Sequence, residues 1–156
     1  MDINYKMIFM SMVDITTKPE VYREATAKGI IRLKPETIIL VKKGRIEKGD
    51  PFEVAKVAGV LAAKNTSSLI PLCHPLPLTG IDIQLKILND STIEATSTVK
   101  TRAQTGVEME ALASVSTVLL TIWDMTKQYE KNANGQYPYT NIQNISVVQK
   151  IKATKI

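Results

Sequence analysis

The chain has 156 residues, of which 44% are hydrophobic and 22% charged, and its net charge is +5 at pH 7. This length fits a single domain, and no apolar run approaches the roughly 18 residues that a membrane-spanning helix needs. The single cysteine excludes an internal disulfide and a closed zinc site of nitrogen and sulfur ligands, and it favours a cytoplasmic location. The positive charge is compatible with phosphorylated small molecules, nucleic acid or acidic lipid, or simply with a solvated basic surface.

The first half of the chain predicts a loose segment, a short strand and a capped helix. Residues 1–28 are polar and charged, and we expect a flexible N-terminal segment there, followed by one domain at 29–156. A strand is expected at 29–33, whereas 36–43 fits either a helical turn or a strand. Asp50 precedes Pro51 as a typical N-cap, which predicts a helix ending near Lys64. Its apolar residues at helical spacing are Val54, Val57, Ala58, Leu61 and Ala62.

The second half predicts a hairpin, a long helix and a last strand. Residues 81–87 and 92–101 alternate between apolar and polar around a turn at 89–91, as in an antiparallel hairpin. A helix is expected at 106–131, followed by a polar loop and a strand at 142–151. The core-facing stripe of the helix at 106–131 is Ala111, Val115, Val118, Ile122, Met125 and Tyr129.

The order strand, helix, strand, strand, helix, strand is the split βαβ pattern. It predicts an α+β, ferredoxin-like βαββαβ fold, in which an antiparallel sheet carries its helices on one face.

The only cysteine and the only histidine of the chain are neighbours, Cys73 and His74, within the proline-rich segment 69–78. Proline fixes its own φ and restricts the residue before it, so His74 is held rigidly ahead of Pro75. A titratable side chain in a stiff, apolar frame suits binding or catalysis. The alternative is a hydrogen-bonded core histidine in a buried connector.

The two ends of the long helix carry further candidates. Thr105 and Glu108 have the spacing of a capping box, which leaves Glu110 unexplained. Asp124 and Lys127 are helix neighbours and could form nothing more than a solvated ion pair. Glu110 and Asp124 lie within about 40° in azimuth but about 21 Å apart along the axis. If both serve one site, a second subunit supplies one of them.

Several stretches together resemble the cyclic pyranopterin monophosphate synthase family, also called molybdenum cofactor biosynthesis protein C. The motifs Cys73-His74 and Glu108-Met109-Glu110 are specific in combination. The matching stretches are residues 12–15, 48–50, 62–64, 70–76, 105–112 and 120–127. The resemblance implies a ferredoxin-like fold and a homohexamer, a trimer of dimers with active sites at subunit interfaces. It implies conversion of 3′,8-cyclo-7,8-dihydroguanosine 5′-triphosphate to cyclic pyranopterin monophosphate, with release of pyrophosphate.

The resemblance also implies the site residues. The implied catalytic residues are Lys48, His74, Asp124 and Lys127. The implied substrate-binding residues are Arg23, Lys64, Cys73, His74, Glu108, Met109, Glu110 and Lys150, with Asp14 and Lys18 near the substrate. No cofactor and no metal site are expected, although Mg²⁺ remains open, and neither nucleic acid nor a membrane is an expected partner. Clustered cations or desolvation are expected to lower the pKa of Lys48 or Lys127 into the working range.

Three other functions compete with this interpretation. Ferredoxin-like sheets often bind single-stranded RNA, but they stack bases on aromatic side chains, and residues 81–99 contain none. A non-catalytic oligomeric scaffold is the second alternative. A metal-dependent phosphohydrolase is the third, and the order of carboxylates along the chain suggests no such site.

Overall fold

A computed structural model describes residues 10–154 of the chain. Its four strands form one antiparallel sheet in the order β2-β3-β1-β4. They are β1 (Val21–Arg32), β2 (Leu78–Ile87), β3 (Thr92–Ala103) and β4 (Asn141–Ala153). Because β3 lies between β1 and β2 and runs antiparallel to both, the topology is the split βαβ arrangement. The predicted α+β, ferredoxin-like fold is confirmed.

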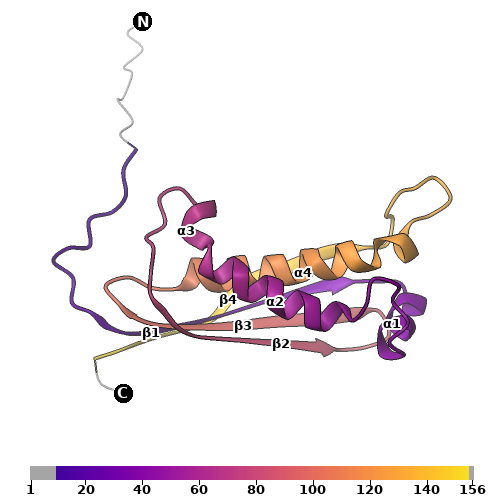
Figure 1. The fold of residues 1–156 in the computed structure, drawn as a ribbon, viewed down its shortest axis with the longest axis horizontal. Coiled ribbons are helices and arrows are strands. Elements are labelled where there is room, and N and C mark those ends of the chain that lie inside the picture. The colour runs from indigo at the N-terminus through magenta and orange to yellow at the C-terminus, as the bar shows by residue number, and fades with distance from the viewer. Residues whose placement is uncertain (1–9, 155–156) are drawn as a thin grey trace, which may run out of the picture.

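The helices lie on one face of this sheet (Figure 1). They are α1 (Pro35–Lys42), α2 (Pro51–Lys64), the short α3 (Thr66–Leu69) and α4 (Glu108–Glu130). α2 and α4 run side by side along the strands, and α1 sits at one end. Among residues 10–154 no helix covers the opposite face, where polar pairs such as Lys28–Glu94 and Thr26–Thr98 lie instead.

The hairpin and the α2 start follow the sequence prediction. Ile87 pairs with Ile93 across the turn, where the Asn89 side chain accepts a hydrogen bond from the Ser91 N–H at 2.9 Å. The Asp50 carboxylate accepts from the N–H of Phe52 at 2.8 Å, as an N-cap does. Local signals of this kind fix both elements because each depends only on neighbouring residues.

The first strand is longer than predicted. β1 begins at Val21, so the expected flexible segment at 1–28 is wrong for residues 21–28, and the expected boundary falls inside a strand. Its helix-facing positions here are the small, buried Ala25 and Ala27, which give only a weak alternating signal. Residues 1–9 of that segment lie outside the described residues. The undecided stretch at 36–43 is helical, with Pro35 in the first turn of α1.

The buried face of α2 also differs from the expected stripe. Val54, Val57 and Leu61 are exposed, and the buried residues of α2 are Pro51, Ala55, Gly59, Ala62 and Ala63. A Cβ on Gly59 would lie only 2.5 Å from Val118 Cγ2 and 2.7 Å from Ile83 Cδ1. α2 therefore packs on small residues, which lets it approach α4 closely and leaves its larger apolar side chains outside.

The core lies between the sheet and α4. Five residues of the predicted stripe are buried: Ala111, Val115, Val118, Ile122 and Met125. Tyr129 is half-buried, and its hydroxyl accepts a hydrogen bond from the Glu47 N–H at 2.9 Å. The predicted capping box is wrong, since α4 starts at Glu108 with Val107 as N-cap and no side-chain cap among the described residues.

Candidate active site

A cavity of about 570 Å³ lies at the N-terminal end of α4. It is open to solvent and bordered by residues 13–18 of the N-terminal segment, by the proline-rich segment and by the loop before α4. Its lining includes Val13, Ile15, Lys18, Leu72, Cys73, His74, Leu76, Thr105, Gly106, Glu108 and Met109. The cavity is mostly apolar with a few charged groups at its edge, as is usual for small-molecule sites.

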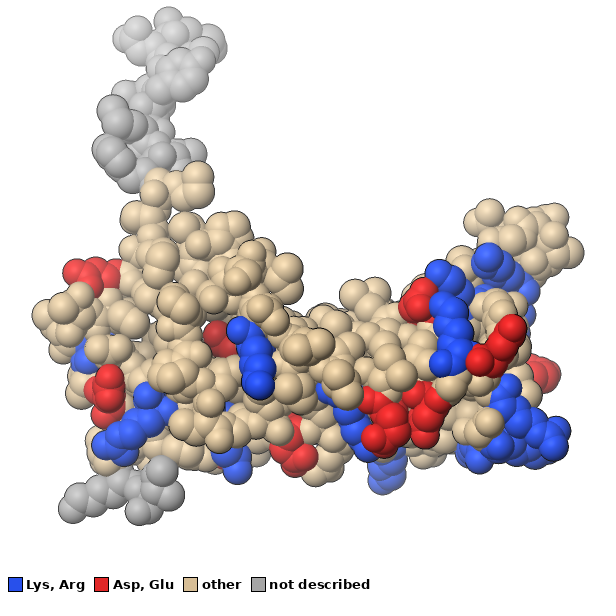
Figure 2. Space-filling model, viewed as in Figure 1, with Lys and Arg blue, Asp and Glu red and all other residues tan. Residues whose placement is uncertain are grey.

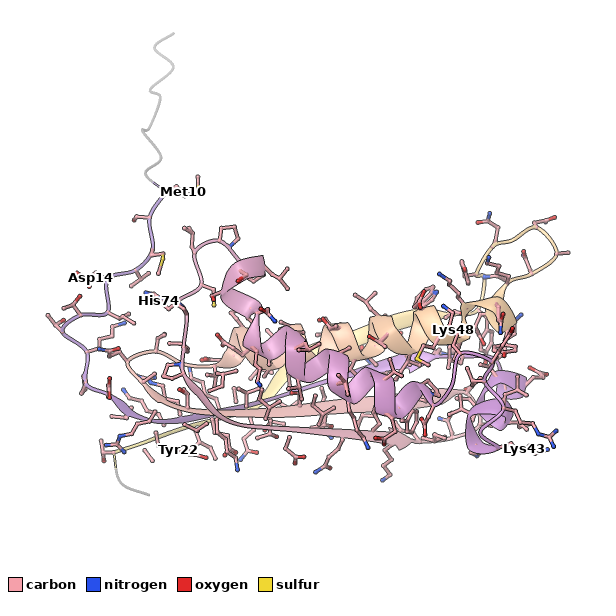
Figure 3. The ribbon with its side chains drawn as sticks, in the orientation of Figure 1. Met10, Asp14, Tyr22, Lys43, Lys48 and His74 are labelled. Atoms are coloured by element: carbon pink, nitrogen blue, oxygen red, sulfur yellow. The ribbon has the colours of Figure 1, made fainter. Side chains whose placement is uncertain are left out.

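His74 ties the N-terminal segment to this cavity. Its Nε2 lies 2.8 Å from the carbonyl oxygen of Val13. A carbonyl only accepts, so His74 donates its Nε2 proton to Val13 and leaves Nδ1 for another partner. The ring lines the cavity and is partly exposed, so it is not the buried core histidine of the alternative interpretation. Figure 3 shows His74 and Asp14 on neighbouring segments at this end of the molecule.

Glu108 is held as a carboxylate at the cavity edge. Its Oε1 forms an ion pair with Lys150 Nζ on β4. Burial by itself would raise the pKa of Glu108, but the hydrogen bond from Lys150, together with the charges of Lys150 and Arg23, lowers it. Gly106 leaves the space that this carboxylate fills, because a Cβ there would overlap it.

Arg23 braces the loop that precedes α4. It donates from Nε to the carbonyl of Ala103 at 3.0 Å and from Nη2 to that of Gln104 at 2.9 Å. Two of its donors therefore fix the backbone that presents Glu108, and its charge is felt at that carboxylate. Arg23 thus has a structural task at this loop, while its predicted contact with the substrate stays a prediction.

The surroundings of Glu110 shift its pKa in the opposite direction to that of Glu108. It is 3% exposed, its Oε1 lies 3.8 Å from Cys73 Sγ, and its Oε2 has no hydrogen-bond partner among the described residues. Burial raises the pKa of Glu110. Burial and the Glu110 carboxylate also raise the pKa of Cys73, which keeps it a thiol. Two carboxyl groups with pKa values shifted in opposite directions are typical of acid–base sites.

A second cluster lies at the C-terminal end of α4. Asp124 Oδ2 is 2.8 Å from Lys48 Nζ, and its Oδ1 is 2.7 Å from Lys127 Nζ. Lys48 also donates to the Asp124 carbonyl at 3.0 Å. Each of these side chains is about half exposed. The structure thus confirms that Lys127 and Asp124 are neighbours and adds Lys48, which comes from the loop before α2.

The hydrogen bonds from Lys127 and then Lys48 lower the pKa of Asp124 to about 2. The hydrogen bond to Asp124 raises the pKa of Lys127. The expectation that clustered cations would lower a lysine pKa is therefore wrong for Lys127. An opposite charge in direct contact outweighs a like charge farther away.

The two clusters do not meet within one chain. Figure 3 shows Lys48 and His74 near opposite ends of the molecule. Figure 2 shows charged side chains at both ends of the molecule, with the densest group around the Lys48 end. Lys64 lies apart from both, in a groove of about 260 Å³ beside Thr79 and Gly80 of β2. Glu110 and Asp124 are 14 positions apart, which corresponds to about 21 Å of helix.

Two residues near the second cluster escaped the sequence analysis. Glu130 is fully buried and accepts hydrogen bonds from the Lys34 N–H and from the hydroxyls of Thr37 and Thr140. Tyr137 packs on Trp123, one residue before Asp124. Neither interaction has a local signal, because each joins positions that only the folded chain brings together.

Within residues 10–154, no three histidine, cysteine, aspartate or glutamate side chains gather in a way that could hold a metal ion. None of the helices described there is both long and apolar enough to cross a membrane.

These features define an α+β protein with a small-molecule site. Its ferredoxin-like sheet carries an apolar cavity edged by Lys18 and Glu108, and a separate lysine–aspartate cluster. The chain belongs to the MoaC family, whose model matches residues 12–153. The resemblance seen in the sequence motifs is thereby confirmed.

Relatives in archaea are similar over nearly the whole chain. A probable cyclic pyranopterin monophosphate synthase of Thermococcus kodakarensis is 56% identical over 92% of this chain and 91% of its own. The protein of the same description from Sulfurisphaera tokodaii is 55% identical over 90% and 93%. That from Methanocorpusculum labreanum is 56% identical over 92% and 90%.

Proposed function

We propose that this chain is a cyclic pyranopterin monophosphate synthase of molybdenum cofactor biosynthesis. It would convert 3′,8-cyclo-7,8-dihydroguanosine 5′-triphosphate to cyclic pyranopterin monophosphate and release pyrophosphate. The observation that carries the proposal is the family match over residues 12–153, with relatives of that description about 55% identical. The two charged clusters of α4 supply groups that this chemistry needs.

The triphosphate calls for cations. Lys18 lines the cavity, Lys150 reaches its edge from β4, and Lys64 lies in a separate groove beside β2. Such groups stabilise the charge of the substrate and of departing pyrophosphate. We assign Lys18, Arg23, Lys64 and Lys150 to this task. Since Lys150 is paired with Glu108 in the free chain, the substrate would compete for it.

The carboxyl groups suit the guanine-derived part. Glu108, held as a carboxylate, can accept hydrogen bonds from the amino and imino groups of the guanine-derived part of the substrate. Glu110, whose pKa is raised by burial, keeps one oxygen without a partner among the described residues, and that oxygen can take part in a hydrogen bond to the same groups. Cys73 and Met109 supply apolar contact surface, because the thiol is kept protonated and Met109 lines the cavity.

Proton transfers are assigned to the second cluster. Asp124 keeps Lys127 protonated and orients its ammonium group, so Lys127 is the candidate proton donor. Lys48, on the other oxygen of Asp124, is the candidate for the complementary base step. His74 orders the N-terminal segment through Val13 and can use Nδ1 toward the substrate. A ribose hydroxyl then attacks the α-phosphorus, forming the cyclic phosphate as the bond to pyrophosphate breaks.

An oligomer would join the clusters, and we propose a homohexamer built as a trimer of dimers. The apolar side chains of α2 left outside the core, Val54, Val57 and Leu61, are exposed, as are Leu69 and Leu72 in the segment that follows. Contiguous exposed apolar side chains mark interaction surfaces. A neighbouring copy could bring its Lys48–Asp124–Lys127 cluster to the cavity. The lone cysteine agrees with a cytoplasmic location.

Turnover of the purified full chain tests the function directly. Incubation with the cyclised GTP derivative should release pyrophosphate and form the cyclic monophosphate, detected by mass spectrometry. Parallel reactions with Mg²⁺ and with a chelator decide whether the metal contributes. Absence of turnover under both conditions by folded protein would contradict the proposal.

A further inference from the structure

The loop between α4 and β4, residues 132–140, is a fixed structure at the Lys48 end of the molecule (Figure 1). The Asn132 side chain accepts hydrogen bonds from the N–H groups of Asn134 at 3.0 Å and Gln136 at 2.9 Å. Gly135 adopts φ +73°, a conformation that favours glycine, and completes the turn. The loop therefore has its own internal scaffold.

Three side chains tie this loop to the body of the protein. Thr140 donates to the buried Glu130 at the end of α4. The Tyr139 ring lies under the Arg32 guanidinium, 5.1 Å from centroid to carbon. Tyr137 packs edge-on against Trp123, with ring centroids 5.6 Å apart and an interplanar angle of 65°. The last contact is the one that reaches the second cluster.

The helix geometry places Tyr137 beside Lys127. Trp123 and Lys127 are four residues apart on α4, so their side chains are neighbours on one face. Asp124, which holds Lys127 at 2.7 Å, follows Trp123 directly. A ring packed on Trp123 thus borders the space in which the Lys127 side chain moves. Tyr137 is also close enough to Lys127 to be among the groups that raise the pKa of Lys127, after the larger effect of Asp124.

We propose that Tyr137 is a positioning residue of the active site: its ring, held on Trp123, forms a wall that keeps the Lys127 ammonium on Asp124 and aimed at the substrate. The inference rests on the proposed function. An exposed lysine has four rotatable bonds, and ordering it against a ring removes much of that freedom before the substrate arrives. The ring, rather than the hydroxyl, does this.

Steady-state kinetics of three variants test the inference. Tyr137→Ala should lower kcat about tenfold with less than about a twofold change in KM, because misplaced groups cost rate rather than binding. Tyr137→Phe keeps the ring and should stay within about twofold of the wild type. Tyr139→Ala removes a ring from the same loop that packs on Arg32 instead, and it should leave kcat unchanged.

A second readout needs no turnover. NMR titration of isotope-labelled Lys127 should show a lower pKa in Tyr137→Ala than in the wild type, because the ammonium spends less time on Asp124. Tyr139→Ala should leave that pKa in place. An unchanged kcat and Lys127 pKa in Tyr137→Ala would overturn the inference, as would equal losses in Tyr139→Ala or in Tyr137→Phe. If the wild type itself fails to turn over, the proposed function fails, while the titration still decides the role of Tyr137.

Discussion

The two ends of α4 carry the same kinds of charged residue in opposite surroundings. At the N-terminal end, Glu110 is 3% exposed and has an unpartnered oxygen among the described residues, and Glu108 is paired with Lys150 beside a cavity. At the C-terminal end, Asp124 and its two lysines are about half exposed and fully paired with one another. One end is therefore shaped to surround a ligand, and the other presents charges outward.

This difference supports the proposal that the two ends are complementary half-sites. Buried carboxyl groups without a cation beside them need a ligand, a partner or a raised pKa. Exposed ion pairs contribute little to stability, so stability alone gives no reason to hold Lys48, Asp124 and Lys127 together. Both observations are explained if the exposed cluster of one copy completes the cavity of another, as proposed above.

The largest expected effect is on the exposed half-site. Lys48→Ala and Lys127→Ala should each lower kcat/KM by about 10³-fold, the size of a lost proton-transfer group, while assembly stays intact by size-exclusion chromatography. Lys28→Ala is a matched control, because Lys28 is similarly exposed and pairs with Glu94 on the open sheet face. Near wild-type rates in either variant would remove that lysine from the chemistry.

The next effect concerns the buried support beneath that half-site. Glu130→Ala should lower the free energy of unfolding by about 3 kcal/mol, since it leaves the Lys34 N–H and two threonine hydroxyls without their acceptor. Glu47→Ala removes an exposed carboxylate that only accepts from Gln128, and it should cost less than about 0.5 kcal/mol. Chemical denaturation measures the free energy of unfolding of both variants. Equal decreases would show that the hydrogen bonds of Glu130 contribute no particular stability.

The smallest effect is a pair of opposite pH dependences at the cavity. The folded-state pKa of Glu110 is raised, so wild-type stability should fall as pH rises from the unfolded value near 4.5 through the folded value. Glu110→Gln should lose that decline. The folded-state pKa of Glu108 is lowered, so its stabilisation is present above the unfolded value and lost as pH falls through the folded one.

Glu108→Gln should therefore destabilise the protein at neutral pH and have little effect in acid. Thermal unfolding of the wild type and the two variants from pH 3 to pH 8 would show how each glutamate changes the slope of stability against pH. If Glu108 and Glu110 changed stability with pH in the same direction, the assigned environments of the two residues would be contradicted.

Sequence alone predicted the elements that depend on local patterns. The hairpin, the Asp50 cap and the α4 core stripe were right because alternation and capping are readable over a few residues. The start of β1 and the face of α2 were wrong, because both bury alanine and glycine rather than large apolar side chains. Here close packing, which the sequence does not display, overrides the apolar pattern.

The same limit applies to the site. Asp124–Lys127 was readable from helix spacing, whereas Lys48 joins Asp124 across 76 positions of the chain. Glu108 shows how a local pattern can mislead. Its capping-box spacing predicts a helix cap, but its partner in the structure is Lys150. Glu130 and Tyr137 carried no local signal, because their partners Thr37 and Trp123 lie far away in sequence.

Mixing of inactive subunits tests the two half-sites most directly. Lys127→Ala and Glu108→Ala chains, each inactive alone, should regain about a quarter of wild-type activity when co-assembled in equal amounts, the fraction of sites that draw both intact halves from different copies. Lys48→Ala mixed with Lys127→Ala should regain nothing, because both defects lie in the same half. Recovery in the first mixture alone is the predicted result, and no recovery in a verified mixed assembly would contradict a site shared between copies.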